Sequence, residues 1–481
     1  MDRAIKVRWL WGVLAGAMIS IPFLAVRFAP ITDLPQQVAQ IRLATEMMAG
    51  SGAPYALNWV GPNRVSYGLL AAGWRLLDPL AVGRIVMLAI GLLWLGAVHA
   101  LAARRQRSIG AALLASILFF NHIVYWGFYS FALGFPAFLA WMLLLSSERR
   151  GPKQAVLVGI GGFVLFACHA LWFGAGLAWF GLRALLLRPR ARVIAWPAIA
   201  LGPVVLLAAI WYPLLGKGGL QTPTEWGTLP WARLSPVWII DAALGGIRGP
   251  LEVGVIILLA AWIGLGLRQR GNTADRELLW AGAMLAAAAL LLPHRFANTL
   301  QLGARWVPAA LTLVLLGAPA PRLPRWLPAA FLALFCLLAA GRWVEIERRE
   351  LSGLEETLEA LPPAPRILGL DYAIQSPRLK VTRPYLQLFA YGQVVQGGEL
   401  NFSFADFATS LVVYDPPRRK AWTPNLEWHP HLVRQGDFRY FTHAIIGGDE
   451  GIHRRFAEHP GIDPATNTGR WRLYALTHTS P

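Results

Sequence analysis

Residues 109–147, IGAALLASILFFNHIVYWGFYSFALGFPAFLAWMLLLSS, decide the fold because the stretch contains no Asp, Glu, Lys or Arg. A helix needs about 20 mostly apolar residues to cross a bilayer, so the stretch is too long for one span and predicts two. Arginines flank it at both ends. A helical hairpin returns both ends to one side of the membrane, and the positive-inside tendency places that side in the cytoplasm.

The rest of the first two thirds of the chain follows the same pattern and predicts about eleven transmembrane helices. Single spans are predicted at 9–27, 81–103, 193–213, 251–268 and 325–342, and hairpins at 109–147, 154–187 and 277–319. The cytoplasmic ends would carry Arg3, Lys6, Arg8, Arg104, Arg105, Arg107, Arg149, Arg150, Lys153, Arg188, Arg190, Arg192, Arg268, Arg270, Arg276, Arg322 and Arg325. We therefore expect a multi-pass protein of the inner or plasma membrane, with a cytoplasmic N-terminus.

Composition supports a membrane protein with one soluble part. Of the 481 residues, 56% are hydrophobic and 15% charged, against about 25% charged in soluble proteins. The whole net charge of +18 lies in residues 1–341, which hold 28 basic and 10 acidic side chains, whereas residues 342–481 hold 16 of each. These values exclude a soluble enzyme, a disulfide scaffold and a basic nucleic-acid-binding surface.

The predicted fold is an α-helical polytopic membrane protein with a small C-terminal α/β soluble domain on the outer side. The transmembrane domain would comprise residues 1–342, with outer loops at 28–80 and 214–250. Residues 343–481 would form the periplasmic or extracellular domain, which starts with a charged helical pattern at 344–360. Short apolar runs in it predict strands at 366–370, 411–414, 443–446 and 471–476.

The first outer loop opens with Thr32-Asp33-Leu34-Pro35-Gln36-Gln37. In a purely structural interpretation, Asp33 caps a helix, Pro35 occupies its first turn and Gln36 completes a pair similar to a capping box. In a functional interpretation, an acid at the membrane surface acts as general base on an acceptor hydroxyl or holds a metal ion. The residues alone leave both interpretations open.

Three parts of the chain resemble GT-C-type membrane glycosyltransferases, which use polyprenyl-phosphate-linked sugars. A short basic N-terminus and one span precede an Asp at the start of a long outer loop. The stretch from Asn121 to Gly134 looks like the turn between paired short spans, and Gly303-Ala304-Arg305-Trp306 looks like the start of a late span in these enzymes. The resemblance implies transfer of a sugar from a polyprenyl-phosphate carrier to an envelope lipid, glycan or protein on the outer face.

The resemblance also implies roles for individual residues. Asp33 would be the general base, while Arg305, with Arg295 and His294 nearby, would neutralise the lipid phosphate. Candidates to line the cavity are His122, Tyr129, His169, Glu225 and Asp241. Leu34 and Gln37 stand where many members carry a second acid or a His, so a divalent metal ion stays open as a cofactor and no metal ligand is assigned.

Three other functions are alternatives to a transferase. A transporter or flippase of lipid-linked sugars is disfavoured as an ion-coupled device because the predicted spans hold few acids. A polymerase or ligase of envelope polymers, and a structural partner of another envelope protein, agree with the same composition.

Glu427, His429 and His431 alternate and would share one face of a strand as a possible metal site, although Pro430 interrupts them. The expected partners are lipid-linked sugars, an acceptor and membrane lipids, without nucleic acid.

Overall fold

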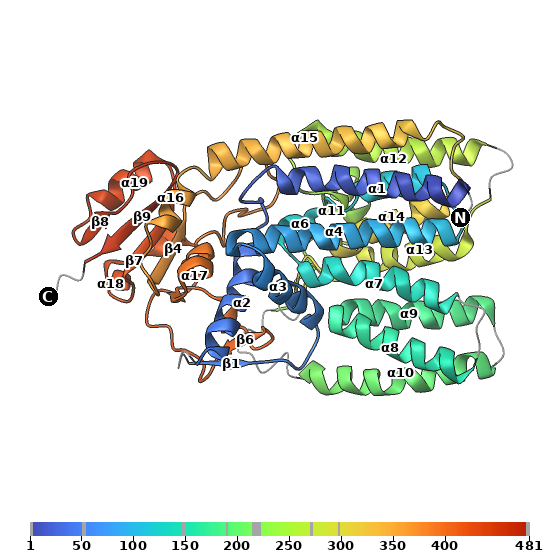
Figure 1. The fold of residues 1–481 in the computed structure, drawn as a ribbon, viewed down its shortest axis with the longest axis horizontal. Coiled ribbons are helices and arrows are strands. Elements are labelled where there is room, and N and C mark those ends of the chain that lie inside the picture. Colours follow the sequence, from blue (N-terminus) through green and yellow to red (C-terminus); the bar gives the residue numbers. More distant parts are fainter. Residues whose placement is uncertain are drawn as a thin grey trace.

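The computed structural model describes residues 3–50, 54–146, 151–188, 191–213, 223–269, 273–296 and 299–477. Long helices run side by side in a bundle, and a smaller region with a β-sheet covers one end of it (Figure 1). Of the predicted outer loop 214–250, residues 214–222 lie outside the described residues, as do Arg149, Arg150, Arg190 and Arg270 of the predicted cytoplasmic ends.

Each of the eleven predicted spans has a helical segment in the structure. Seven segments are long and apolar enough to cross a membrane, three are shorter, and α13 is the eleventh. They are α1 (Arg3–Leu24), α4 (Pro79–Arg104), α5 with α6 (Ile109–Ile117 and His122–Trp126), α7 (Tyr129–Leu145), α8 (Pro152–Cys168), α9 (Ala170–Leu187), α10 (Ala191–Trp211), α12 (Pro250–Arg268), α13 (Arg276–Leu291), α14 (Val307–Gly317) and α15 (Trp326–Glu350). The prediction of a multi-pass α-helical membrane protein is confirmed.

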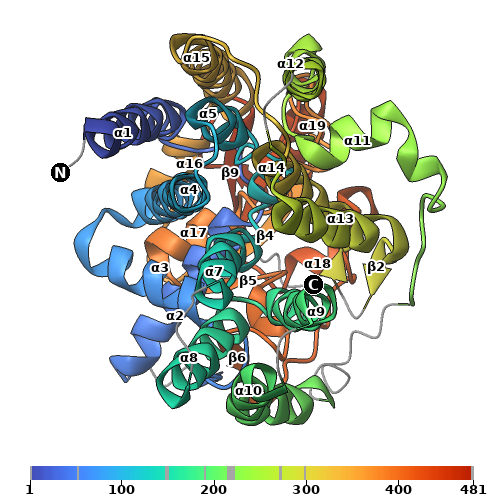
Figure 2. The same ribbon diagram turned by 90° about the vertical axis from the view of Figure 1, so that its right-hand side faces the viewer.

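The uncharged stretch 109–147 supplies the centre of the bundle. All residues of Ile109–Trp126 are buried, whereas only 11% of the residues in Ile194–Trp211 of α10 are buried. Helix α10 therefore lies at the periphery of the bundle (Figure 2). Aromatic side chains join α15 to α1 and to the segment that follows α5: the Phe23 ring of α1 meets Trp343 edge-on at 4.9 Å, and Phe120, just after α5, contacts Phe335 at 5.5 Å. Such pairs add about 0.5–1.5 kcal/mol each beyond the area that they bury.

The turn predicted near 121–130 is present, and Asn121 and Gly127 form it. The buried Asn121 side chain accepts a hydrogen bond from the Ile123 amide at 2.9 Å and donates to the Leu118 carbonyl at 2.6 Å, which satisfies the backbone where α5 stops and α6 starts. Gly127 ends α6 with φ +85°, a conformation that favours glycine. The chain then reverses into α7.

The C-terminal region contains a five-stranded sheet in the order β5-β4-β7-β9-β8. Strand β4 is parallel to β5 and β7, and β9 is antiparallel to β7 and β8. The strands are β4 (Arg366–Asp371), β5 (Glu399–Leu400), β7 (His443–Gly447), β8 (Ile462–Pro464) and β9 (Trp471–Leu476). The other elements are α16 (Leu354–Glu359), α17 (Ala390–Gln396), η4 (Phe404–Asp406), η5 (Pro430–Leu432), α18 (Gln435–Phe438) and α19 (Glu450–Ala457).

Three of the four predicted strands lie in this sheet, and the fourth pairs elsewhere. Strand β6 (Val412–Tyr414) pairs antiparallel with β1 (Tyr55–Leu57) of the predicted loop 28–80. The charged pattern at 344–360 is not one helix, because α15 continues from the bundle to Glu350 and α16 follows after a break at Gly353, whose φ is +81°.

Two long connections of the bundle lie against the C-terminal region. The first contains α2 (Leu34–Met48) and α3 (Arg64–Leu76), and α2 packs on α17 across the end of the bundle (Figure 1). The second contains η2 (Ala232–Leu234) and α11 (Pro236–Ala243). The later turn before α14 holds β2 (Arg295–Phe296), β3 (Thr299–Leu300) and η3 (Ala304–Trp306).

The capping-box interpretation of Gln36 is wrong. Its side-chain amide donates to Gln387 at 3.0 Å and to the Phe402 carbonyl at 3.1 Å, and its oxygen accepts from the Phe404 amide at 3.0 Å. The residue is fully buried, so its polar atoms need partners and take them from the C-terminal region. Gln36 therefore fastens α2 to that region.

Candidate active site

Asp33 lies where the start of the first outer loop meets the stretch from Asn121 to Gly134, the first two segments that resemble GT-C enzymes. The backbone amides of Thr32 and Asp33 donate to the carbonyls of Tyr125 and Trp126 at 2.9 and 3.0 Å. Gly127 follows directly, and a Cβ atom added to it would stand 3.0 Å from the Asp33 nitrogen. The segment before α2 is therefore held against the turn between α6 and α7, which fixes the backbone of Asp33.

The Asp33 carboxyl makes no hydrogen bond that caps α2, so of the two interpretations of this residue the side-chain cap is wrong. The carboxyl is enclosed by protein, while the residue as a whole is partly exposed. Burial raises its pKa from 3.8 to about 7, and the positive charge of Arg305 limits the rise. The pKa of Asp33 therefore lies near neutral pH.

Arg305 in η3 is the cation that acts on Asp33. Its guanidinium lies 3.7 Å from the centre of the Phe128 ring and 5.6 Å from that of Phe131, and its Nε donates to the Leu300 carbonyl at 2.9 Å. Within the described part of the chain, Arg305 attracts Asp33 across space without forming an ion pair with it. The aromatic rings orient a charge that remains available to an anion.

Two cavities are lined by residues next to this pair. The larger, of about 690 Å³, has Gln37, Tyr67 and His169 among its polar residues and receives apolar side chains from α9 and α10. The smaller, of about 230 Å³, is lined by Trp126, whose carbonyl accepts from Asp33, and by Ala304, the neighbour of Arg305. Two cavities are thus lined by residues that neighbour Asp33 and Arg305.

The cavity candidates named from the sequence are distributed between these spaces. His169 lines the larger cavity and caps α9, because its Nδ1 accepts from the Leu171 amide at 3.1 Å. His122, His294 and Asp241 line the smaller cavity. The structure thus brings three of these side chains, distant in sequence, into one place.

Tyr129, Glu225 and Arg295 use their polar atoms within the protein. Tyr129 is buried near Asp33, and its hydroxyl donates to the Gly83 carbonyl in α4 at 2.8 Å. Arg295 forms an ion pair with Glu225 at 2.9 Å, and the two residues also share backbone hydrogen bonds. The structure therefore places Arg295 with an acid of the 214–250 loop.

The donors around Asp33 do not fit a divalent cation. Among the described residues, no group of three or more His, Cys, Asp or Glu is arranged to hold a metal ion. The strand expected through Glu427, His429 and His431 is wrong, because Pro430 begins the turn η5 and the alternation is lost. The charge that acts on Asp33 is the guanidinium of Arg305, whereas Mg²⁺ and Ca²⁺ require several oxygen ligands.

Sequence reasoning missed several residues of the site. Phe128 lies inside the quoted stretch but showed no sign that it stacks on an arginine 177 positions away. Gln301 has φ +54°, and Lys380 reaches the smaller cavity from the C-terminal region. A charged side chain in an exposed-looking loop carries no local signal of such a long-range contact.

Comparisons with known proteins agree on the fold. No protein-family model and no curated protein matches the chain in sequence. Two solved structures match it over nearly its whole length, both of ArnT from Cupriavidus metallidurans. In the apo state the TM-score is 0.56 at 13% identity, with 98% of each chain covered. Bound to undecaprenyl phosphate, the TM-score is 0.53 at 13% identity, with 96% of this chain and 97% of ArnT covered.

The chain has the ArnT fold. ArnT is a GT-C glycosyltransferase, so the predicted resemblance to GT-C enzymes is confirmed for the fold. Because the match covers both chains almost completely, the ArnT fold here includes the helical bundle and the strand-containing C-terminal region.

Replacing Gly127 by alanine is expected to displace Asp33. The new Cβ atom would stand 3.0 Å from the Asp33 nitrogen, and the alanine would have to adopt a positive φ. Together these effects should lower the free energy of unfolding by about 1–3 kcal/mol. The matched control is Gly50→Ala, with a similar φ of +80° but open space around the added atom. Thermal unfolding should show a larger loss for Gly127→Ala; equal losses would mean that only backbone strain matters.

Proposed function

We propose that this chain is a membrane glycosyltransferase that moves a sugar from a polyprenyl-phosphate carrier to an acceptor hydroxyl of an envelope lipid, glycan or protein. The proposal rests chiefly on one observation: the buried Asp33 carboxyl, with its pKa raised to about 7, lies within reach of the positive charge of Arg305. The ArnT fold supports it, because one ArnT structure contains bound undecaprenyl phosphate.

The proposed reaction is a single displacement. The Asp33 carboxylate removes the proton of the acceptor hydroxyl, whose oxygen bonds to the anomeric carbon of the donor sugar. The bond between that carbon and the phosphate oxygen breaks, and its electron pair leaves with the lipid phosphate. Arg305 stabilises the negative charge that develops there, and Asp33 then releases its proton to the phosphate or to water. No step uses a metal ion.

The larger cavity suits the lipid-linked donor. Leu171, Phe173 and Leu177 of α9 and Val205 of α10 give it an apolar wall within helices that can span a membrane. Its polar residues include Gln37, Tyr67 and His169, and Gln37 lies one helical turn after Asp33. We place this end of the bundle and residues 343–481 at the outer face of an inner or plasma membrane, because the basic segments would then remain in the cytoplasm.

The test is transfer of label from a panel of radiolabelled polyprenyl-phosphate sugars to envelope extract by protein in nanodiscs. Since the base form of Asp33 accumulates above its pKa, kcat/KM should rise about tenfold per pH unit below about 7 and level off above it. A flat profile between about pH 5.5 and 8.5 would contradict the role of Asp33. Movement of labelled lipid between leaflets without transfer would instead support a flippase.

A further inference from the structure

The smaller cavity contains polar side chains whose hydrogen-bonding capacity is unused. His122 is only 4% exposed and lines the cavity, yet neither ring nitrogen has a hydrogen-bond partner among the described residues. The backbone of Ala242 acts on the ring from nearby, but no hydrogen bond of normal distance and angle forms between them. Because buried polar groups normally find partners, the imidazole is prepared for a ligand in the cavity.

Gln301 provides a second unused group from another segment. Its side-chain oxygen is buried without a partner among the described residues, and the residue lines the same cavity. Its φ of +54° is uncommon for a residue with a side chain, and such conformations cluster at functional sites. An imidazole and an amide that both offer donor and acceptor atoms match hydroxyl groups, which also donate and accept.

Two further features of the lining suit a neutral ring. Trp126 and Trp238 contribute to the lining, and the C–H face of a sugar can pack on an aromatic side chain. Lys380 does not provide a free positive charge, because it pairs with Asp241 at 2.6 Å and with the buried Glu252 at 2.9 Å. At about 230 Å³, the cavity is smaller than the range of about 300–1,000 Å³ typical of drug-sized ligands.

We propose that this cavity binds one neutral sugar ring, the terminal sugar of a glycan or glycolipid acceptor. The assignment to the acceptor rests on the proposed function, in which the larger, apolar cavity takes the lipid-linked donor. Trp126, whose carbonyl accepts from the Asp33 amide, and Ala304, the neighbour of Arg305, both line the smaller cavity, so the bound ring would lie near the segment that carries the proposed base.

The test uses saturation-transfer NMR of purified protein in nanodiscs with a panel of neutral methyl hexosides and pentosides, and with inorganic phosphate. At least one methyl glycoside should bind saturably and phosphate should not compete with it. His122→Leu and Gln301→Ala should each weaken this binding about tenfold or more. His99→Leu is the matched control, because His99 also has an unpartnered buried ring nitrogen but lies outside the cavity.

Unfolding curves show which variants are folded. If His122→Leu does not fold, Gln301→Ala still tests the proposal. Binding of no glycoside, binding of phosphate at this cavity, or equal binding by wild type and both variants would each overturn the proposal. Asp33→Asn separates it from the proposed function, since that variant should bind the glycoside and fail in transfer. Transfer by wild type without glycoside binding would leave the transferase standing and remove only the sugar cavity.

Discussion

Replacing Asp33 by asparagine is expected to lower kcat/KM for sugar transfer by about 10²–10⁴-fold, the contribution typical of a positioned general base. Asparagine has nearly the same shape, so the backbone bond to Trp126 and the contact with Gly127 remain. It lacks the capacity to accept the hydroxyl proton. The measurement is label transfer at pH 8, where the wild-type carboxyl is mostly ionised because its pKa is about 7.

The same substitution should stabilise the protein above neutral pH. Burial raises the folded-state pKa of Asp33 to about 7, so the carboxyl favours the folded state while protonated, and that advantage is lost as the pH rises through about 7. At 1.36 kcal/mol per unit, the ionised form costs on the order of 4 kcal/mol at pH 8. Asp33→Asn removes this cost, so its Tm should exceed that of wild type at pH 8 and approach it at pH 5.

Asp78 provides the matched control for both measurements. It precedes the proline-containing first turn of α4 as Asp33 precedes that of α2, and its carboxyl caps α4 by accepting from the Leu80 amide at 3.0 Å. Asparagine caps helices about as well as aspartate, so Asp78→Asn should leave transfer and Tm unchanged. Equal transfer by wild type and Asp33→Asn would show that Asp33 is not the base.

The helices of the bundle could be predicted because their signal is local. A run of apolar residues between basic ends is recognised without its neighbours, and every predicted span has a helix in the structure. The strands at 366–370, 443–446 and 471–476 are likewise apolar runs in a polar region. The order β5-β4-β7-β9-β8 could not be predicted, because pairing depends on contacts between distant segments.

The site could be predicted only in part for the same reason. Asp33 and Arg305 were singled out from short motifs, but the ring of Phe128 under the guanidinium joins segments far apart in the chain. The local rule that aspartate caps a helix failed, because the hydrogen-bonding of Gln36 with the C-terminal region and the docking of Asp33 on Trp126 decide the local geometry. Tertiary contacts thus override capping propensity where a polar group faces a cavity.

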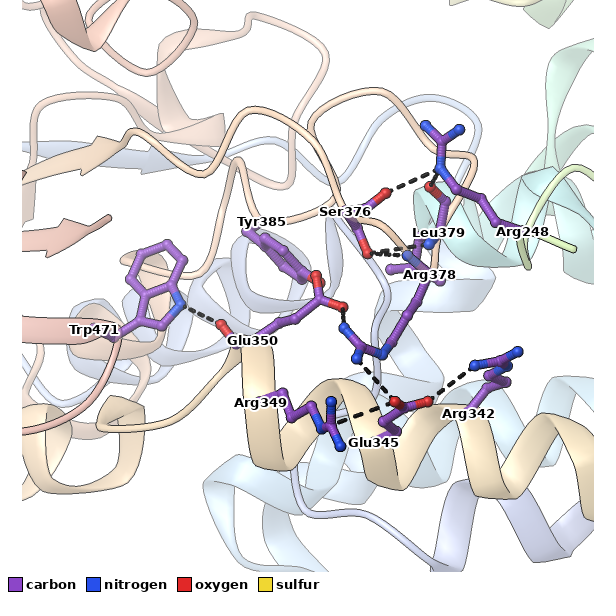
Figure 3. A network of polar contacts seen from close by, with 10 residues as sticks. All are labelled: Arg248, Arg342, Glu345, Arg349, Glu350, Ser376, Arg378, Leu379, Tyr385 and Trp471. Carbon is purple, nitrogen blue, oxygen red and sulfur yellow. Dashed lines mark hydrogen bonds and ion pairs between the residues drawn. The ribbon is translucent and has the colours of Figure 1, made fainter. Parts of the chain in front are cut away.

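Replacing Glu350 by alanine is expected to lower the free energy of unfolding by about 2–4 kcal/mol. Glu350 ends α15 with its side chain only 1% exposed, where it accepts from Arg378 at 2.9 Å and from the Tyr385 hydroxyl at 2.6 Å (Figure 3). The variant leaves a guanidinium and a buried hydroxyl without this partner. Thermal and denaturant unfolding in detergent measure the loss.

Glu345→Ala is the matched control for Glu350→Ala. Glu345 also pairs with Arg378, at 2.8 Å, but it is more exposed and its ion pairs are screened by solvent, so its loss should cost less (Figure 3). Glu350→Gln should lie between the two, since its amide oxygen still accepts from Tyr385. Equal losses for Glu350→Ala and Glu345→Ala would contradict the importance of burial.

The Glu350 substitution should also affect the smaller cavity, because Arg378 positions the segment that carries Lys380. Backbone bonds continue the connection: the Arg248 amide donates to the Arg378 carbonyl at 2.8 Å, and the Lys380 amide donates to the Gly246 carbonyl at 2.9 Å. If Glu350 is lost, Arg378 keeps its ion pair with Glu345 and Lys380 its pair with Asp241, but this wall loses its buried ionic anchor. Acceptor KM should then rise more than kcat falls, whereas Asp33→Asn lowers kcat, so the two substitutions separate binding of the acceptor from its deprotonation.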